Sequence, residues 1–178
     1  MKIDKEISKR KIKTRRVSIK EVDSAILSAF QSFKGMPHRM EFVGSVNKIS
    51  FYNDSKATNP EAASKSISSL KNIYLLAGGI SKIDNIGPIE PYVKNIKEVY
   101  LFGRDKNLLK SLFEKHLLRC HIFENMRESF EKAFLDAINS QETSVILLAP
   151  LCSSLDQFEN FEERGNIFKN ICNDKITK

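Results

Sequence analysis

The chain has 178 residues, of which 41% are hydrophobic and 29% charged, a balance that indicates one globular domain rather than a disordered chain. Its formal net charge is +7, but residues 1–20 contain nine basic and two acidic side chains, so the other residues together carry no net charge. The lack of a basic excess in the body of the chain argues against a nucleic-acid-binding fold. No apolar run approaches the ~20 residues that span a bilayer, and three cysteines without a Cys-x-x-Cys pair argue against a disulfide scaffold or structural zinc site and favour a cytoplasmic setting.

The basic excess lies in a segment with no apolar periodicity, so residues 1–17 are predicted to form a flexible leader. Ser18 and Glu21 then form a capping box, the signature of a helix start. Apolar residues recur after it at three- and four-residue spacing, up to a Gly and a Pro that end such elements. A helix is therefore predicted over residues 18–36.

Two short strand-like runs follow, residues 41–46 and 49–53, and the turn Asn47-Lys48 between them predicts a hairpin. A polar loop over residues 54–59 comes next. Asn59-Pro60-Glu61 then provides a cap residue, a proline at the first helical position and an acid in the first turn, which together predict a helix.

Strands and helices alternate from there to the C-terminus. Strands are predicted at 72–77, 98–102, 120–123 and 144–148, and helices at 88–95, from Asp105 as cap to Leu118, at 126–138, and in a terminal segment through Phe168. Strands that are apolar on both faces and separated by helices indicate a parallel sheet covered on both sides. The fold class is therefore α/β, a Rossmann-like, doubly wound and mostly parallel sheet with helices on both faces and a short N-terminal hairpin.

Four polar loops follow predicted strands, namely residues 54–59, 78–84, 103–105 and 149–155. In doubly wound folds the loops after parallel strands meet at one edge of the sheet, where ligands bind. Lys56 and Lys82 lie in two of them, beside glycine or small polar residues. A loop lysine is usually solvated surface, but this recurrence suits an anionic ligand, because lysine supplies charge and glycine permits close backbone approach.

Other polar residues in these segments allow two interpretations each. Asp54 is either a turn former or an acceptor for ribose hydroxyls or a lysine, and Arg39 either pairs with Glu41 or binds phosphate. Cys152 has no histidine near the predicted edge, so a cysteine hydrolase is not favoured. The chain also contains no G-x-G-x-x-G or G-x-x-x-x-G-K-[ST] motif, and so no standard phosphate loop of its own.

Five runs of sequence together resemble the C-terminal part of the Mur ligases, which are ATP-dependent amide ligases. The runs are Pro37-His-Arg-Met-Glu-Phe42, Asn53-Asp-Ser-Lys-Ala-Thr-Asn59, Leu75-Leu-Ala-Gly-Gly79 with Lys82, Phe102-Gly-Arg-Asp105, and Ser154-Leu-Asp-Gln-Phe158 continuing to Gly165. The Ser-Leu-Asp-Gln-Phe run is similar to the branch that adds D-glutamate. The resemblance covers residues from about 18 to 172. Residues 18–36 resemble the end of the family's central ATPase domain, and residues 37–178 are predicted to form its C-terminal, D-glutamate-binding domain.

The resemblance implies a reaction of peptidoglycan synthesis in which ATP phosphorylates the carboxylate of UDP-N-acetylmuramoyl-L-alanine and the amine of D-glutamate attacks the acyl phosphate. It implies that Lys56 and Arg39 are catalytic, at the acyl-phosphate end and at the phosphates, and that Arg39 and Asp54 bind the nucleotide. D-Glutamate would be held by five residues, namely Thr58, Lys82, Ser154, Leu155 and Phe161.

The chain departs from the family at Ala149 and Leu151, and these 178 residues contain neither a UDP-binding domain nor the Gly-Lys-Thr phosphate loop. ATP and Mg²⁺ are therefore expected in the complete enzyme, with no metal ligands here, and the isolated chain is predicted to be inactive. A second chain that supplies the missing domains is a possible partner, and a membrane is not. The alternatives are a non-catalytic remnant, or a nucleic-acid-binding module that uses the basic leader.

Overall fold

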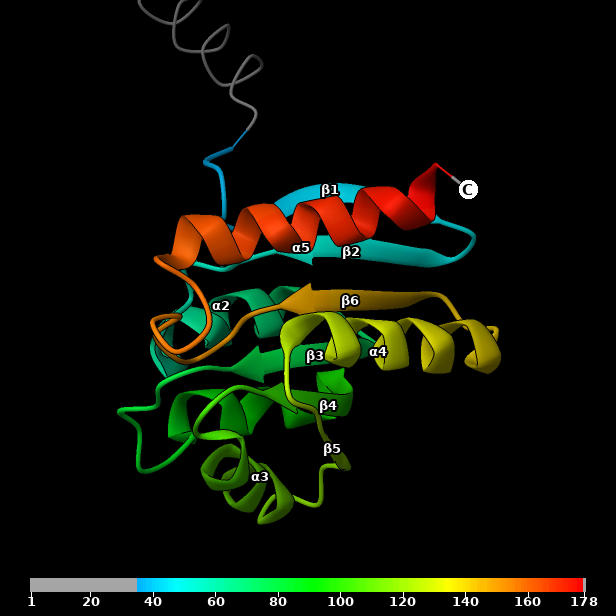
Figure 1. The fold of residues 1–178 in the computed structure, drawn as a ribbon. Helices are drawn as coiled ribbons and strands as arrows, with labels where there is room; N and C mark the ends of the chain where they lie inside the picture. The colour runs from blue at the N-terminus through cyan, green and yellow to red at the C-terminus, as the bar shows by residue number, and fades with distance from the viewer. Residues whose placement is uncertain (1–34, 178) are drawn as a thin grey trace, which may run out of the picture. The chain divides into compact units, whose positions relative to one another are not determined.

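The structure is a computed structural model that describes residues 35–177 (Figure 1). The predicted leader over 1–17 and nearly all of the predicted helix over 18–36 lie outside the described residues. Gly35 and Met36, the last two positions of that predicted helix, are not helical. Within the described range, no helix has the length and apolar character needed to cross a membrane.

Six strands form one sheet in the order β1-β2-β6-β3-β4-β5. The strands are β1 (Glu41–Val46), β2 (Ile49–Asn53), β3 (Ile73–Gly78), β4 (Ile96–Phe102), β5 (Cys120–Ile122) and β6 (Ser144–Leu148). Among these six strands of the described residues, the β1–β2 hairpin pairing is antiparallel and the other four pairings are parallel. The predicted α/β fold, with its hairpin and mostly parallel sheet, is confirmed.

One face of the sheet is covered by α2 (Pro60–Ser69), η2 (Gly87–Asn95) and α3 (Lys106–Glu114). Their apolar residues, such as Ile67, Ile89 and Phe113, pack with Leu75 and Leu101 of the central strands in one buried cluster. Asn59 caps α2 as predicted, because its side chain accepts a hydrogen bond from the Ala62 amide at 2.8 Å.

The other face is covered by α4 (Met126–Ser140) and α5 (Phe161–Ile176), which lie side by side across the sheet in Figure 1. Phe130 of α4 and Phe168 of α5 meet edge to face at 5.8 Å, and both belong to the second buried cluster with Phe102 and Phe51 of the sheet. Because side chains alternate across a strand, β2 sends Phe51 and Asn53 toward α5, whereas Asp54 lies on the α2 side.

Three of the predicted helices differ from their observed form. The helix predicted at 88–95 is the 3₁₀-helix η2, which contains Pro88 and Pro91, and a proline inside an α-helix removes a hydrogen bond. Helix α3 ends at Glu114, one turn before the predicted Leu118, and α5 runs on past Phe168 to Ile176. Ile171 and Cys172 continue the apolar face of α5, which explains its greater length.

The two edges of the sheet are irregular or short. In β1, the register with β2 shifts between Phe42 and Gly44, which marks a bulge in the edge strand. At the opposite edge, β5 has three residues and pairs only with β4.

Candidate functional site

The four loops that follow β2, β3, β4 and β6 meet at one edge of the sheet, as the sequence predicts. Ile80 and Ser153 exchange two backbone hydrogen bonds of 2.9 and 3.0 Å, which join the loops after β3 and β6. The amide of Asp105 donates to the Gly79 carbonyl at 3.1 Å, and this bond adds the loop after β4. The site is therefore a single connected surface built from segments distant in sequence.

Gly79 allows the loops after β3 and β6 to approach this closely. Its φ is +127°, and an added Cβ would lie 2.0 Å from the carbonyl oxygen of Ser153. No side chain fits in that space, so the close approach of the two backbones requires glycine at position 79.

Asp105 occupies the N-cap position of α3, as predicted, but it does not cap the helix through its side chain. Its side chain makes no cap hydrogen bond and instead accepts one from the Ser81 amide at 2.7 Å. This bond and the adjacent Arg104 guanidinium lower the pKa of the Asp105 carboxyl below its usual range, the guanidinium being the larger cause. The carboxylate thus fixes the loop that carries Lys82.

Arg164, on the first turns of α5, joins three of the loops from beneath. Its side chain is fully buried, and its guanidinium donates to Ser55 Oγ at 3.0 Å, to the Ser55 carbonyl at 2.9 Å and to the Cys152 carbonyl at 3.1 Å, with a longer bond of 3.4 Å to the Gly78 carbonyl. Burial lowers the pKa of Arg164 to about 10, so it stays charged at neutral pH. Arg164 therefore stabilises the loops after β2, β3 and β6 together.

A pocket between the β1–β2 hairpin and α2 brings together three of the predicted site residues, Arg39, Asp54 and Lys56. The rest of its lining is contributed by Met40, Ala57, Ala62, Lys65 and Ser66. Three cationic side chains thus surround one carboxylate and an apolar wall. This combination is suited to a ligand with an anionic and an apolar part.

Asp54 lies beneath this pocket and is 7% exposed. It accepts hydrogen bonds from the Met40 amide at 3.2 Å and from the Ser66 hydroxyl. Burial is the larger influence and raises the pKa of the Asp54 carboxyl above its usual range. Among the described contacts it pairs with no lysine, so it is left to act as a hydrogen-bond acceptor.

Arg39 is exposed and does not pair with Glu41 among the described contacts. Glu41 instead accepts hydrogen bonds from the His38 amide at 2.9 Å and from Lys169 Nζ at 3.1 Å. The structure therefore does not contain the alternative ion pair between Arg39 and Glu41, and the Arg39 guanidinium is available to a ligand in the pocket.

Lys56 links this pocket to Phe161 of α5. Its ammonium lies 4.5 Å from the centre of the Phe161 ring, within the range of a cation–π contact. Two residues predicted to serve different substrates, the acyl phosphate and D-glutamate, are therefore in contact. Thr58 lies two residues beyond Lys56 and is exposed.

The remaining predicted D-glutamate residues lie further along the same edge. Leu155, 65% exposed, lines a second hollow in which Asp156 and Lys106 also take part. Ser154 is buried, and its carbonyl accepts the Phe158 amide at 3.0 Å. Lys82 is exposed in the loop after β3. The structure thus groups Arg39, Asp54, Lys56 and Phe161 closely and leaves Thr58, Lys82, Ser154 and Leu155 outside that group.

Cys152 is buried, and burial raises the pKa of its thiol to about 11, which disfavours the thiolate that a nucleophile needs.

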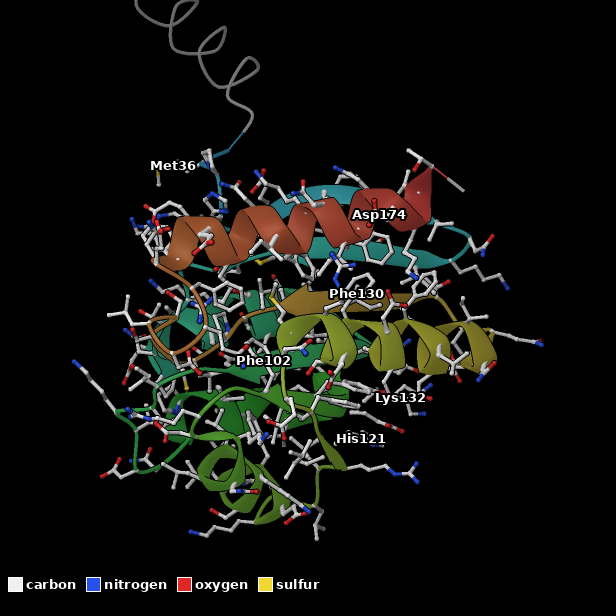
Figure 2. All side chains as sticks on the ribbon, in the orientation of Figure 1. Met36, Phe102, His121, Phe130, Lys132 and Asp174 are labelled. Carbon is white, nitrogen blue, oxygen red and sulfur yellow. The ribbon has the colours of Figure 1, made fainter. Side chains whose placement is uncertain are left out.

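One group of potential metal ligands lies away from the carboxyl edge of the sheet, in the region where α4 covers β4 and β5. Glu98, His121 and Asp136 bring one ligand-type atom each within 4.8 Å of one another, and Figure 2 labels His121 there. These atoms already have partners, because Tyr100 donates to both carboxylates and Lys132 bonds Asp136. The group is therefore explained as a hydrogen-bonded ion network.

Comparison with known proteins identifies the family. The model of the Mur ligase glutamate ligase domain matches residues 38–152, which include the β1–β2 hairpin, the first pocket, the loops after β3 and β4 and the first part of the loop after β6. The chain belongs to the Mur ligase family. Two curated relatives are UDP-N-acetylmuramoylalanine--D-glutamate ligases, one from Rickettsia conorii, 48% identical over 148 residues, and one from Prochlorococcus marinus, 44% identical over 158 residues.

These alignments cover 83% and 84% of this chain but only 29% and 32% of the relatives, so the chain spans about a third of their length. Among solved structures, a UDP-N-acetylmuramate-alanine ligase from Thermotoga maritima superposes with a TM-score of 0.58 over 90% of this Mur ligase chain and 36% of its own. At 14% identity this likeness supports the fold alone.

Sequence reasoning assigned no role to His38, Lys65 or Arg164, all of which the structure places at the site. Lys65 lies two turns into a helix that was predicted, so its position in the pocket follows from the predicted start of α2. Arg164 stands beside two glutamates, and a charged run of this kind indicates a solvated helix face. Its burial carries no signal in the sequence.

Proposed function

We propose that this chain supplies the D-glutamate-binding domain of the ATP-dependent ligase that adds D-glutamate to UDP-N-acetylmuramoyl-L-alanine in peptidoglycan synthesis, in the cytoplasm. The observation that carries the proposal is the contact of Lys56 with Phe161, next to the pocket shared by Arg39, Asp54 and Lys56. The relatives' printed names support the choice of D-glutamate.

In the proposed reaction, a carboxylate oxygen of UDP-N-acetylmuramoyl-L-alanine bonds to the γ-phosphorus of ATP and ADP leaves. The amine of D-glutamate then bonds to the acyl carbon, releases inorganic phosphate and loses a proton. Negative charge develops on the phosphoryl oxygens in both steps, so a cation fixed near them lowers the barrier. Arg39 and Lys56 supply such charge, and Asp54 accepts hydrogen bonds from the ribose hydroxyls.

The D-glutamate side of the site is assigned to Thr58, Lys82, Ser154, Leu155 and Phe161. A dicarboxylate requires cationic and hydroxyl donors, which Lys82, Thr58 and Ser154 provide. Phe161 and the exposed Leu155 supply apolar walls. Because Lys56 contacts the Phe161 ring, the ammonium lies at the boundary where the acyl phosphate and the incoming amine must meet.

The donors of the first pocket do not fit Mg²⁺. That ion prefers several oxygen ligands, whereas this pocket offers three cations and one carboxylate that already accepts two hydrogen bonds. No step is therefore assigned to Mg²⁺ on these residues. The 178-residue sequence also contains no phosphate-loop motif, so we propose that the chain alone does not catalyse ligation and that a second chain could complete the enzyme.

The test is calorimetric titration of the full chain with D-glutamate, L-glutamate and ATP. We expect D-glutamate to bind more tightly than L-glutamate, and Lys82→Ala to abolish this binding. Lys48→Ala, in the turn at the opposite end of the sheet, removes the same charge and is expected to change nothing.

Three outcomes would count against the proposal. Absence of binding to either amino acid or ATP would favour a non-catalytic remnant. Salt-dependent RNA or DNA binding that disappears when residues 1–17 are deleted would favour the nucleic-acid-binding alternative. Ligation by the purified chain without an added partner would overturn the claim that it is inactive alone.

A further inference from the structure

The turn that carries Arg39 into the pocket has an unusual backbone. His38 and Met40, on either side of Arg39, have φ angles of 61° and 45°, in the left-handed region that non-glycine residues rarely adopt. Such conformations persist only where surrounding contacts hold them in place, and they are concentrated at functional sites. The contacts of His38 show what holds this turn.

His38 is 6% exposed, and its side chain lies on the α5 side of the sheet. Gly165 of α5 makes the room for it, because an added Cβ there would lie 2.2 Å from His38 Nδ1. On the other side, Asn53 Nδ2 lies 3.0 Å from the same Nδ1. The imidazole is thus enclosed between β2 and α5.

These neighbours determine the tautomer of His38. Asn53 Nδ2 also donates to Glu41 Oε2 at 3.0 Å and to the Gly165 carbonyl at 3.3 Å, and Asn53 Oδ1 accepts the Ser55 amide at 3.1 Å. These partners fix the orientation of the amide, so its nitrogen faces His38 Nδ1. Asn53 Nδ2 has two hydrogens for three neighbouring acceptors, so it shares them among Glu41, the Gly165 carbonyl and Nδ1. A proton on Nδ1 would point at the amide nitrogen, which accepts no hydrogen bond, so we assign the neutral ring with its proton on Nε2.

His38 contacts two members of the close group of site residues, Lys56 and Phe161. Its carbonyl accepts the Lys56 amide at 3.2 Å, and its ring packs edge to face on Phe161 with centroids 6.1 Å apart. Arg39, the next residue, lies on the α2 side, where it lines the pocket. One residue therefore touches the loop of Lys56 and the ring of Phe161 while its neighbour supplies the pocket's guanidinium.

We propose that neutral His38 is a positioning residue, which holds Arg39, Lys56 and Phe161 in one arrangement and so couples the first pocket to the Phe161 wall on the proposed D-glutamate side of the site. What these two parts of the site bind rests on the proposed function, but the coupling of the three residues does not. Protonation of Nδ1 would place an N–H against the Asn53 amide, which loses that hydrogen bond and loosens the arrangement.

Four charged groups face the imidazole, namely Lys169 and Glu162 of α5, Glu41 of β1 and Lys56 of the loop after β2. Burial first and Lys169 next lower the pKa of His38 below its ordinary value, and they outweigh the two glutamates. The unfolded chain therefore takes up the proton before the folded chain does. The arrangement is complete at neutral pH and is lost as the pH falls through the folded pKa.

The first test is a pH titration of the isotope-labelled full chain by NMR, which needs no ligand. We expect the His38 ring signal to titrate with a midpoint below that of a free histidine, and the Lys56 amide and Phe161 ring signals to shift with the same midpoint. In His38→Asn these coupled shifts should disappear, because asparagine tolerates the left-handed backbone and offers an oxygen to Asn53 but does not titrate. His116→Asn, on the far side of the sheet, is the control and should leave them unchanged.

The second test is ligand binding, measured with ATP and D-glutamate on the same chain. His38→Ala should weaken both by a similar factor, about tenfold each, and His38→Asn should recover most of the loss for ATP. If the Lys56 and Phe161 signals ignore the titration of His38, or if His38→Ala weakens one ligand alone, the coupling is wrong. Coupled signals in a chain that binds neither ligand would support the positioning role and refute the proposed function instead.

Discussion

Replacement of Arg164 by methionine tests how the loops of the site are held together. The side chain is fully buried and donates to the carbonyls of Ser55, Cys152 and Gly78. Methionine keeps the volume but leaves three buried acceptors without a donor, at about 1–3 kcal/mol each. The Arg164 guanidinium has no carboxylate within 4.0 Å among the described residues, so its burial costs free energy. The substitution removes that cost, which offsets the loss of the hydrogen bonds by several kcal/mol at most. The net loss in the free energy of unfolding should be about 3 kcal/mol.

Urea unfolding followed by far-UV circular dichroism at neutral pH measures this loss. Arg164→Lys should lose about 2 kcal/mol, because an ammonium keeps the charge but cannot reach all three carbonyls at once. Arg127→Met is the matched control, since that side chain is exposed and lies 4.0 Å from Asp174, and it should cost under ~0.5 kcal/mol. A loss below ~1 kcal/mol in Arg164→Met would show that the buried bonds give no net stabilisation, and would refute the reasoning.

Three further predictions concern the site. Burial raises the pKa of the Asp54 carboxyl, so folding favours its neutral form and the wild type gains stability as the pH falls through the folded pKa. Asp54→Asn should remove this gain, and identical pH profiles of unfolding for the two proteins would contradict the prediction. Gly79→Ala should lower the free energy of unfolding by more than ~2 kcal/mol. Gly87→Ala should cost far less, because the added Cβ would lie 3.1 Å from its nearest atom, Asn85 Oδ1. Equal losses in urea unfolding would show that the backbone of Gly79 and Ser153 moves apart to accept the Cβ. Phe161→Leu should shift the Lys56 ammonium resonance and weaken D-glutamate binding about tenfold, and an unchanged resonance would exclude the cation–π contact in solution.

The sequence predicted the strands well because each is a short apolar run between turn residues, and the order of strands and helices then determined which loops meet. For Asp105 the sequence predicted the helix start correctly but not the partner of the side chain, and the reason is physical. A local cap and a distant amide compete for one carboxylate, and Ser81, 24 residues away, provides the stronger partner in the fold. The extension of α5 past Phe168 could have been predicted from the sequence, because Ile171 and Cys172 continue the apolar spacing of the helix.

The site itself was only partly accessible to sequence reasoning. Arg39, Asp54 and Lys56 were placed together by a resemblance, and the structure shows the pocket that unites them. His38 and Arg164 act through burial between elements far apart in the chain. No local pattern of residue types records such burial, so their contacts emerge only from the packing of α5 against the loops.

The irregular margins of the sheet have a consequence for how this domain meets other chains. An exposed strand with a long regular ladder is a template on which a foreign strand can extend the sheet. Here one margin is interrupted at Phe42–Gly44 and the other offers only Cys120–Ile122. Among residues 35–177, neither margin therefore offers the long regular ladder that strand addition requires, and extension of the sheet by a foreign strand is disfavoured at both edges.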